Sequence, residues 1–106
     1  MTTRDDGFVA VAQIDDIPDG AMKCVAINRE RVLLARVGGE FYALRDTCGH
    51  RNAPLSRGRL SGYGVECPLH FARFDVRTGK LIDGPISADV PTYEVRIEAE
   101  CVLVRH

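Results

Sequence analysis

The sequence lacks long hydrophobic runs, an apolar leader and a helical repeat of hydrophobic residues. Its apolar runs span only a few residues, whereas a membrane-crossing helix needs about 20, so we expect no membrane association. The opening residues, MTTRDDGF, contain no apolar core of a signal peptide, which favours a cytoplasmic protein. The formal net charge is only −1, so the chain has no overall attraction for nucleic acid.

Nucleotide-binding glycine motifs are also missing. The segment GRLSGYG at 58–64 has neither the spacing nor the strand-to-helix context of a phosphate-binding loop. Four cysteines are present, and in a reducing cytosol cysteines bind metal or pack as small hydrophobes more often than they form disulfides. We therefore expect no nucleotide chemistry and examine the cysteines as metal ligands.

Short segments rich in Val, Ile, Phe and Tyr alternate with turn residues, a pattern typical of an all-β protein. At 106 residues the chain is the size of a single domain, which we place at 1–106. Gly38-Gly39 predicts a two-residue hairpin turn, Gly79 a left-handed turn position, and 98–100 a last hairpin. The predicted strands are 8–14, 22–28, 31–37, 40–45, 63–67, 71–76, 80–82, 93–98 and 101–105.

The middle of the chain breaks this pattern. From 46 to 62, Gly, Pro, Arg, Asn and Ser replace the strand residues. A long irregular segment in a small β protein indicates a functional or ligand-binding role. The segment starts at one Cys/His pair, Cys48 and His50, and runs toward a second pair, Cys67 and His70.

Each pair mixes one thiolate with one imidazole. A tetrahedral zinc ion could accept two sulfurs and two nitrogens, although zinc fingers usually place both cysteines on one knuckle. The mixed order suits a Rieske [2Fe–2S] centre, in which one iron keeps two cysteines and the other takes two histidines. A structural zinc module stays open as an alternative.

The motifs CGH (48–50) and CPLH (67–70), followed by FARFDVRTGK, resemble the Rieske-type [2Fe–2S] ferredoxins of bacterial aromatic-ring-hydroxylating dioxygenase systems. The resemblance extends to FYALRDTCGH, to DGP (83–85) and to PTYEVRIEAECVLV. It implies an antiparallel β-sandwich-like base with a small cluster-binding lobe of two ligand loops, at about 46–84. It also implies the ligand set: Cys48 and Cys67 on one iron, His50 and His70 on the other.

The function implied by this resemblance is soluble electron transfer by a monomer. Single electrons would pass from a flavin-dependent ferredoxin reductase to a terminal oxygenase. The catalytic oxygenase component needs a further iron held by two histidines and a carboxylate. The chain has three histidines, and the cluster would leave only His106, so we expect no enzyme. A small Rieske-like subunit of a nitrite reductase remains the alternative.

Two pairs of positions depart from high-potential Rieske relatives. Ala53 and Leu69 stand where those relatives carry a bridging disulfide, and Ala72 and Phe74 stand where they carry Ser and Tyr. Fewer hydrogen-bond donors leave the added electron less stabilised, which predicts a potential near the low end of the Rieske range, about −150 mV.

The residues around the ligands allow two further predictions. Pro54, Leu69 and Phe71 would form an apolar rim that shields the cluster, receives a partner, or does both, and Pro85 would stiffen a third loop. The segment from 45 to 80 contains seven basic and three acidic residues. We interpret these charges as solvated and partly paired with near neighbours rather than as a docking face for an acidic partner. The basic residues are Arg45, Arg51, Arg57, Arg59, Arg73, Arg77 and Lys80.

The other two cysteines have no ligand partners nearby. Cys24 and Cys101 lie in strand-like segments without a neighbouring histidine or a second cysteine at ligand spacing. We expect both to be buried small hydrophobes.

Overall fold

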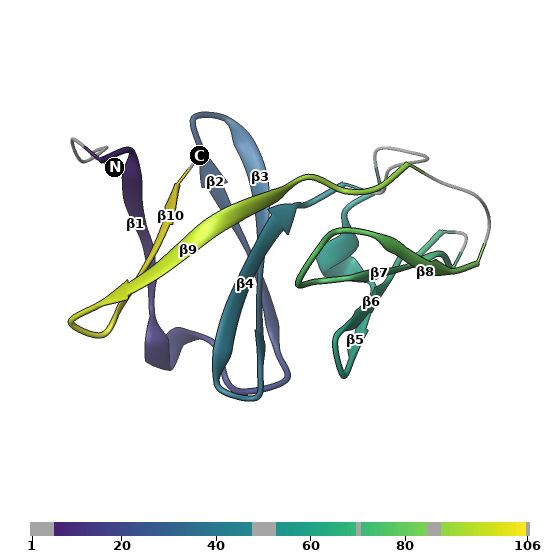
Figure 1. Ribbon diagram of the computed structural model, residues 1–106, viewed down its shortest axis with the longest axis horizontal. Coiled ribbons are helices and arrows are strands. Elements are labelled where there is room, and N and C mark those ends of the chain that lie inside the picture. The colour runs from purple at the N-terminus through teal and green to yellow at the C-terminus, as the bar shows by residue number, and fades with distance from the viewer. Residues whose placement is uncertain (1–5, 48–52, 70, 85–87, 106) are drawn as a thin grey trace.

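The computed structural model describes residues 6–47, 53–69, 71–84 and 88–105. Within these ranges the chain forms two antiparallel sheets (Figure 1). The base has strand order β1-β10-β9-β4-β3-β2, and the lobe has order β5-β6-β7-β8. The base strands are β1 (Phe8–Gln13), β2 (Met22–Ile27), β3 (Glu30–Val37), β4 (Glu40–Arg45), β9 (Thr92–Glu98) and β10 (Cys101–Arg105). The lobe strands are β5 (Arg59–Ser61), β6 (Gly64–Glu66), β7 (Arg73–Asp75) and β8 (Leu81–Asp83). The all-β prediction is confirmed.

Strand β3 lies between two hydrophobic cores. Residues 32–35, Val-Leu-Leu-Ala, are all fully buried, and alternate side chains of a strand point to opposite faces. Val32 and Leu34 pack in the core of the base, whereas Leu33 and Ala35 pack in a second core shared with the lobe. The lobe is therefore anchored to the base through one continuous apolar strand.

The base resembles a small sandwich. Strands β4 and β9 pair through only two residue pairs, so the sheet consists of two three-stranded halves. Its outer strands β1 and β2 also contact each other. The halves enclose the buried base core, which contains Val9, Ile17, Ile27, Val32, Leu34, Phe41, Ala43, Val102 and Val104.

The predicted turns have the backbone that the sequence indicated. Gly38 and Gly39 have φ of 61° and 82°, as a two-residue hairpin with a primed turn requires. Gly79 has φ of 76°. The last hairpin turns at Ala99 and Glu100, both with positive φ, although neither is a glycine.

Two sequence predictions were wrong in detail. The segment 46–62 is not wholly irregular, since it contains a short 3-10 helix, η2 (Leu55–Arg57), and strand β5. Cys24 and Cys101 are half-buried rather than buried, because both lie in strands of the base that leave them partly open to solvent. A second 3-10 helix, η1 (Ile14–Asp16), was not predicted. Neither helix of the described ranges is long and apolar enough to cross a membrane.

Candidate metal centre

The second ligand loop begins at a fully buried cysteine. Cys67 is 0% exposed and packs in the core shared by base and lobe, beside Ala72 and Phe74. Its backbone N–H donates to the Ala72 carbonyl at 2.8 Å, and its carbonyl accepts the Phe71 N–H at 3.1 Å. These two hydrogen bonds close residues 67–72 into a tight loop, so the direction of the thiol is fixed by backbone and core packing.

The other three predicted ligands, Cys48, His50 and His70, lie outside the described residues. Their joint coordination with Cys67 therefore stays a prediction. Two thiolates with two imidazoles form the donor set of a Rieske centre, and a thiol held in a dry, apolar core suits an iron–sulfur ligand. The residues present thus fit the cluster, and the chemistry of Cys67 supports it.

The neighbours of His70 in the sequence are exposed apolar side chains. Leu69 is 62% exposed and Phe71 is 65% exposed. Phe71 also has φ of 62°, an unusual value for a bulky residue. Backbone strain of this kind concentrates at functional sites, where the surrounding structure maintains it. Pro54, the third predicted member of the rim, is only half-buried and precedes helix η2.

A third segment packs directly against the second ligand loop. Gly84 follows strand β8 with φ of 102°. A Cβ at this position would lie 2.8 Å from the Ala72 Cα and 3.1 Å from the Phe71 carbonyl oxygen. Only glycine allows the two backbones to approach this closely. Pro85, the predicted stiffening residue, lies outside the described residues.

The approach to the first ligand loop contains a buried carboxylate that the sequence analysis missed. Asp46 is 0% exposed. It accepts hydrogen bonds from the Ser56 backbone N–H and hydroxyl, both at 2.6 Å. The sequence analysis counted Asp46 only as one of the charges between 45 and 80. Asp at the end of a strand is common in solvent-exposed turns, so nothing in the sequence marked this residue as buried.

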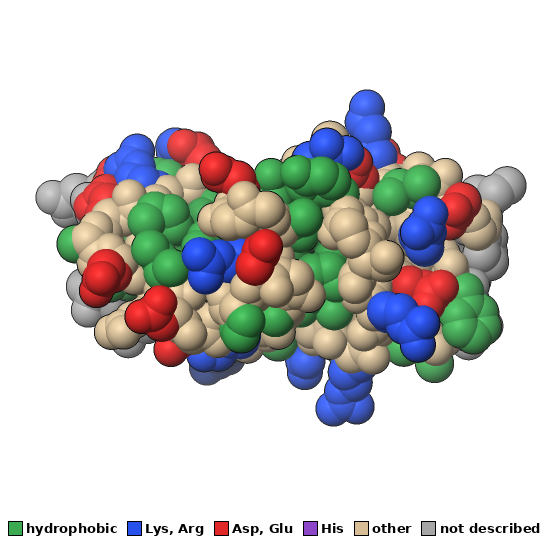
Figure 2. Space-filling view, turned by 90° about the horizontal axis from the view of Figure 1, so that it is seen from below, with side chains coloured by type: hydrophobic (Ala, Val, Ile, Leu, Met, Phe, Trp, Pro, Cys, Tyr) green, Lys and Arg blue, Asp and Glu red, His purple; other side chains and the backbone are tan. Residues whose placement is uncertain are grey.

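Two arginines of the described lobe, Arg73 and Arg77, have local acidic partners. The Arg73 guanidinium donates two hydrogen bonds to Asp83. The Arg77 guanidinium donates two to Asp75, and the Arg77 backbone N–H donates a third. These hydrogen bonds hold the pKa of both carboxyls below its usual range. Arg45, at the end of β4, likewise lies 2.8 Å from a Glu30 oxygen. Figure 2 shows basic and acidic side chains interspersed on one face, as local pairing predicts.

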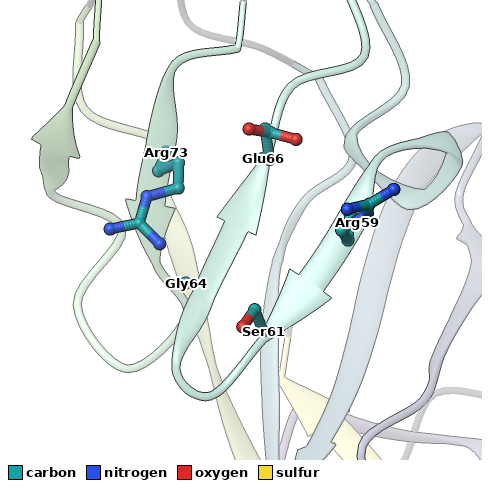
Figure 3. A pocket seen from close by; sticks show the side chains of 5 residues that line it. All are labelled: Arg59, Ser61, Gly64, Glu66 and Arg73. Atoms are coloured by element: carbon teal, nitrogen blue, oxygen red, sulfur yellow. The ribbon is translucent and has the colours of Figure 1, made fainter.

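A shallow hollow on the surface of the lobe is also lined by both basic and acidic side chains. Arg59, Glu66 and Arg73 occupy paired positions on strands β5, β6 and β7. Figure 3 shows the glutamate between the two arginines. Opposite charges on neighbouring strands stabilise a sheet modestly, so the hollow has a structural explanation.

Comparison with known proteins identifies the family of this chain. The Rieske [2Fe-2S] domain family matches residues 7–94. The ferredoxin component of the naphthalene 1,2-dioxygenase/salicylate 5-hydroxylase systems of Ralstonia sp. is 42% identical over 98 residues, covering 92% of this chain and 94% of that protein. The ferredoxin of carbazole 1,9a-dioxygenase from Nocardioides aromaticivorans IC177 superimposes with a TM-score of 0.88 and 33% identity, over 92% of this chain and 95% of that one.

A solved complex gives a similar match. One chain of the complex of reduced oxygenase and oxidized ferredoxin in carbazole 1,9a-dioxygenase has a TM-score of 0.88 and 33% identity, over 93% of each chain. The resemblance in the sequence, the fold and the expected cofactor are thereby confirmed. The chain belongs to the Rieske [2Fe–2S] family and is a ferredoxin, a non-catalytic electron carrier with one Rieske cluster.

Proposed function

We propose that this ferredoxin passes single electrons from a flavin-dependent ferredoxin reductase to a terminal oxygenase that hydroxylates aromatic rings. One observation carries the proposal: the second ligand loop buries Cys67 completely but exposes Leu69 and Phe71, the neighbours of His70. An electron carrier needs this polarity, since the cluster must be shielded on one side and approachable on the other. The ferredoxin components among its relatives support the same role.

We infer that Cys48 and Cys67 hold one iron and that His50 and His70 hold the other. When bound, the cluster stores one electron. The chain supplies the dry core around Cys67 and an apolar rim at Leu69 and Phe71, where a partner can exclude water. A monomeric single domain over 1–106, with its cluster lobe at about 46–84, and a cytoplasmic location complete the proposal.

The cluster assignment is tested by electron paramagnetic resonance on anaerobically reduced protein. We expect a rhombic spectrum with an average g value of about 1.91, below that of a cluster held by four cysteines, because two imidazoles replace two thiolates. Iron and sulfide are assayed in the same sample, and a redox titration gives the potential, expected at about −150 mV.

The alternatives give different results. One zinc ion per chain with a silent spectrum would make the two loops a structural clasp and end the electron-transfer proposal. A subunit of a nitrite reductase would copurify with a large partner, whereas a ferredoxin purifies alone and reduces a ring-hydroxylating oxygenase.

The rim is tested by Phe71→Asn. Asn tolerates positive φ better than Phe, so the variant should fold at least as well as the wild type. It removes an exposed aromatic ring of the kind that dominates protein interfaces, so we expect electron transfer to an oxygenase that the wild type reduces to slow about tenfold. Stopped-flow oxidation of the reduced ferredoxin measures the rate.

The matched control is Ile97→Asn, which removes a 43% exposed hydrophobic side chain from strand β9 of the base. Its electron-transfer rate should equal that of the wild type. Both variants should keep the cluster spectrum and the potential. Equal rates for Phe71→Asn and the wild type would show that the rim only shields the cluster.

A further inference from the structure

Asp46 is the only charged side chain in the buried set of the described residues, at 0% exposure. It lies directly after strand β4 and precedes Cys48 by two residues. Burying a carboxylate is costly unless hydrogen bonds and opposite charge compensate it. A buried charge at this point in the chain therefore calls for a specific role.

The carboxylate connects the lobe to the base. Its Oδ1 accepts the Ser56 N–H at 2.6 Å, and its Oδ2 accepts the Ser56 hydroxyl at 2.6 Å. The Arg31 guanidinium of strand β3 approaches Oδ2 at 3.4 Å, and the Asp46 N–H donates to the Arg31 carbonyl at 3.0 Å. Ser56 lies in η2, so one side chain joins two base strands to the lobe.

The same contact closes the stem of the first ligand loop. Residues 47–55 run between Asp46 and Ser56 and include Cys48 and His50. Fixing both ends of a loop removes part of the entropy that ligand binding would otherwise cost. The second loop is closed by its own backbone hydrogen bonds. Among the described residues, the Asp46 side chain is bonded across the stem of the first loop.

Helix η2 needs the carboxylate for a second reason. Its N-cap residue, Pro54, provides no side-chain hydrogen bond, and the first N–H groups of a helix have no partner within the helix. Asp46 accepts the Ser56 N–H from outside the helix. Loss of the carboxylate would therefore release η2 as well as the loop stem.

We propose that Asp46 is a positioning residue of the cluster site, whose carboxylate holds the stem of the first ligand loop so that Cys48 and His50 are presented to the cluster in one arrangement. The proposal rests on the ligand assignment made under the proposed function. Asp46 acts through Ser56 and η2.

The test compares three variants of the cluster-loaded protein. Asp46→Ala removes both hydrogen bonds to Ser56. Asp46→Asn retains them, since its amide oxygen accepts the N–H and its NH₂ donates to the hydroxyl. It loses only the longer contact of Oδ2 with the half-exposed Arg31 guanidinium. Val104→Ala truncates a buried residue of the base core, which does not include Cys67, and shows what general destabilisation alone does. Iron release to a chelator is measured for each variant at a temperature the same number of degrees below its own melting temperature. The paramagnetic resonance spectrum of the reduced cluster is recorded for each variant as well.

We expect Asp46→Ala to release iron about ten times faster than Val104→Ala, in line with the loss of other residues that orient metal ligands. Its g values should also spread, because the loop then holds the ligands in several arrangements. Asp46→Asn should stay closer to the wild type than Asp46→Ala in both measurements, because it keeps the hydrogen bonds to Ser56 and loses only the Arg31 contact. Equal release rates and equal spectra for Asp46→Ala and Val104→Ala would overturn the proposal.

A milder variant covers the case in which Asp46→Ala does not fold. Ser56→Ala removes the hydroxyl but keeps the N–H contact, so iron release should be faster than in Val104→Ala, and an equal rate would overturn the positioning role. A wild-type protein without a [2Fe–2S] spectrum would instead overturn the proposed function and the positioning role together. If the wild type has a normal cluster and the variants release iron no faster than Val104→Ala, only the positioning role is overturned and the proposed function stands.

Discussion

We expect Cys67→Ala to yield a folded β protein without a Rieske cluster. The residue is fully buried in the core between base and lobe, where alanine is tolerated sterically but supplies no thiolate. With one of four ligands missing, the cluster should not assemble normally. Iron and sulfide content, visible absorption and the spectrum of the reduced state measure the loss, and circular dichroism reports whether the sheets remain.

Two other cysteines serve as matched controls. Cys24 in β2 and Cys101 in β10 are half-buried in the base. Burial raises the pKa of the Cys24 thiol, which keeps it protonated and unsuited to metal binding. Cys24→Ala and Cys101→Ala should keep full iron content. A complete cluster in Cys67→Ala, or a lost cluster in Cys101→Ala, would contradict the ligand assignment. Cys24 also interacts with the Asp46 carboxylate, so iron loss in Cys24→Ala alone would be assigned to that contact.

The base could be predicted from the sequence because its signals are local. The apolar run of β3 and the Gly38-Gly39 turn follow from burial and backbone preferences that act over a few residues. Strand β5 escaped detection because only Leu60 in its three residues is apolar. It pairs with β6 across a two-residue turn at Gly62 and Tyr63.

In the candidate site, too, some residues could be predicted from the sequence and others could not. Ligand types and spacing predicted Cys67 and its three partners as the ligand set, since few cofactors require that donor set in that order. The residues that support them were not recognisable. Asp46 is hydrogen-bonded to Ser56, ten positions away, and this contact depends on where η2 lies relative to the base. Supporting groups of this kind are contacts of the folded chain, so a single sequence does not reveal them.

Gly84→Ala should destabilise the lobe and shorten the lifetime of the cluster. The new methyl group would lie 2.8 Å from the Ala72 Cα, closer than van der Waals contact, and such overpacking costs about 1–3 kcal/mol. The positive φ of 102° adds a backbone penalty of order 1–3 kcal/mol. Relief of the clash requires the end of β8 or the second ligand loop to move, and the loop includes Cys67.

Gly20→Ala separates these two effects. Gly20 has φ of 83°, but a Cβ there would have no atom within 4 Å, so this variant has only the backbone penalty. We expect the melting temperature of Gly84→Ala to lie at least about 4 °C below that of Gly20→Ala, as 1 kcal/mol of overpacking predicts for a domain of this size. Iron release should accelerate in Gly84→Ala alone, because only that substitution displaces a ligand loop. Equal melting temperatures and equal iron release would mean that the segment after β8 moves away without cost, and that its close approach to Ala72 does not hold the second loop in place.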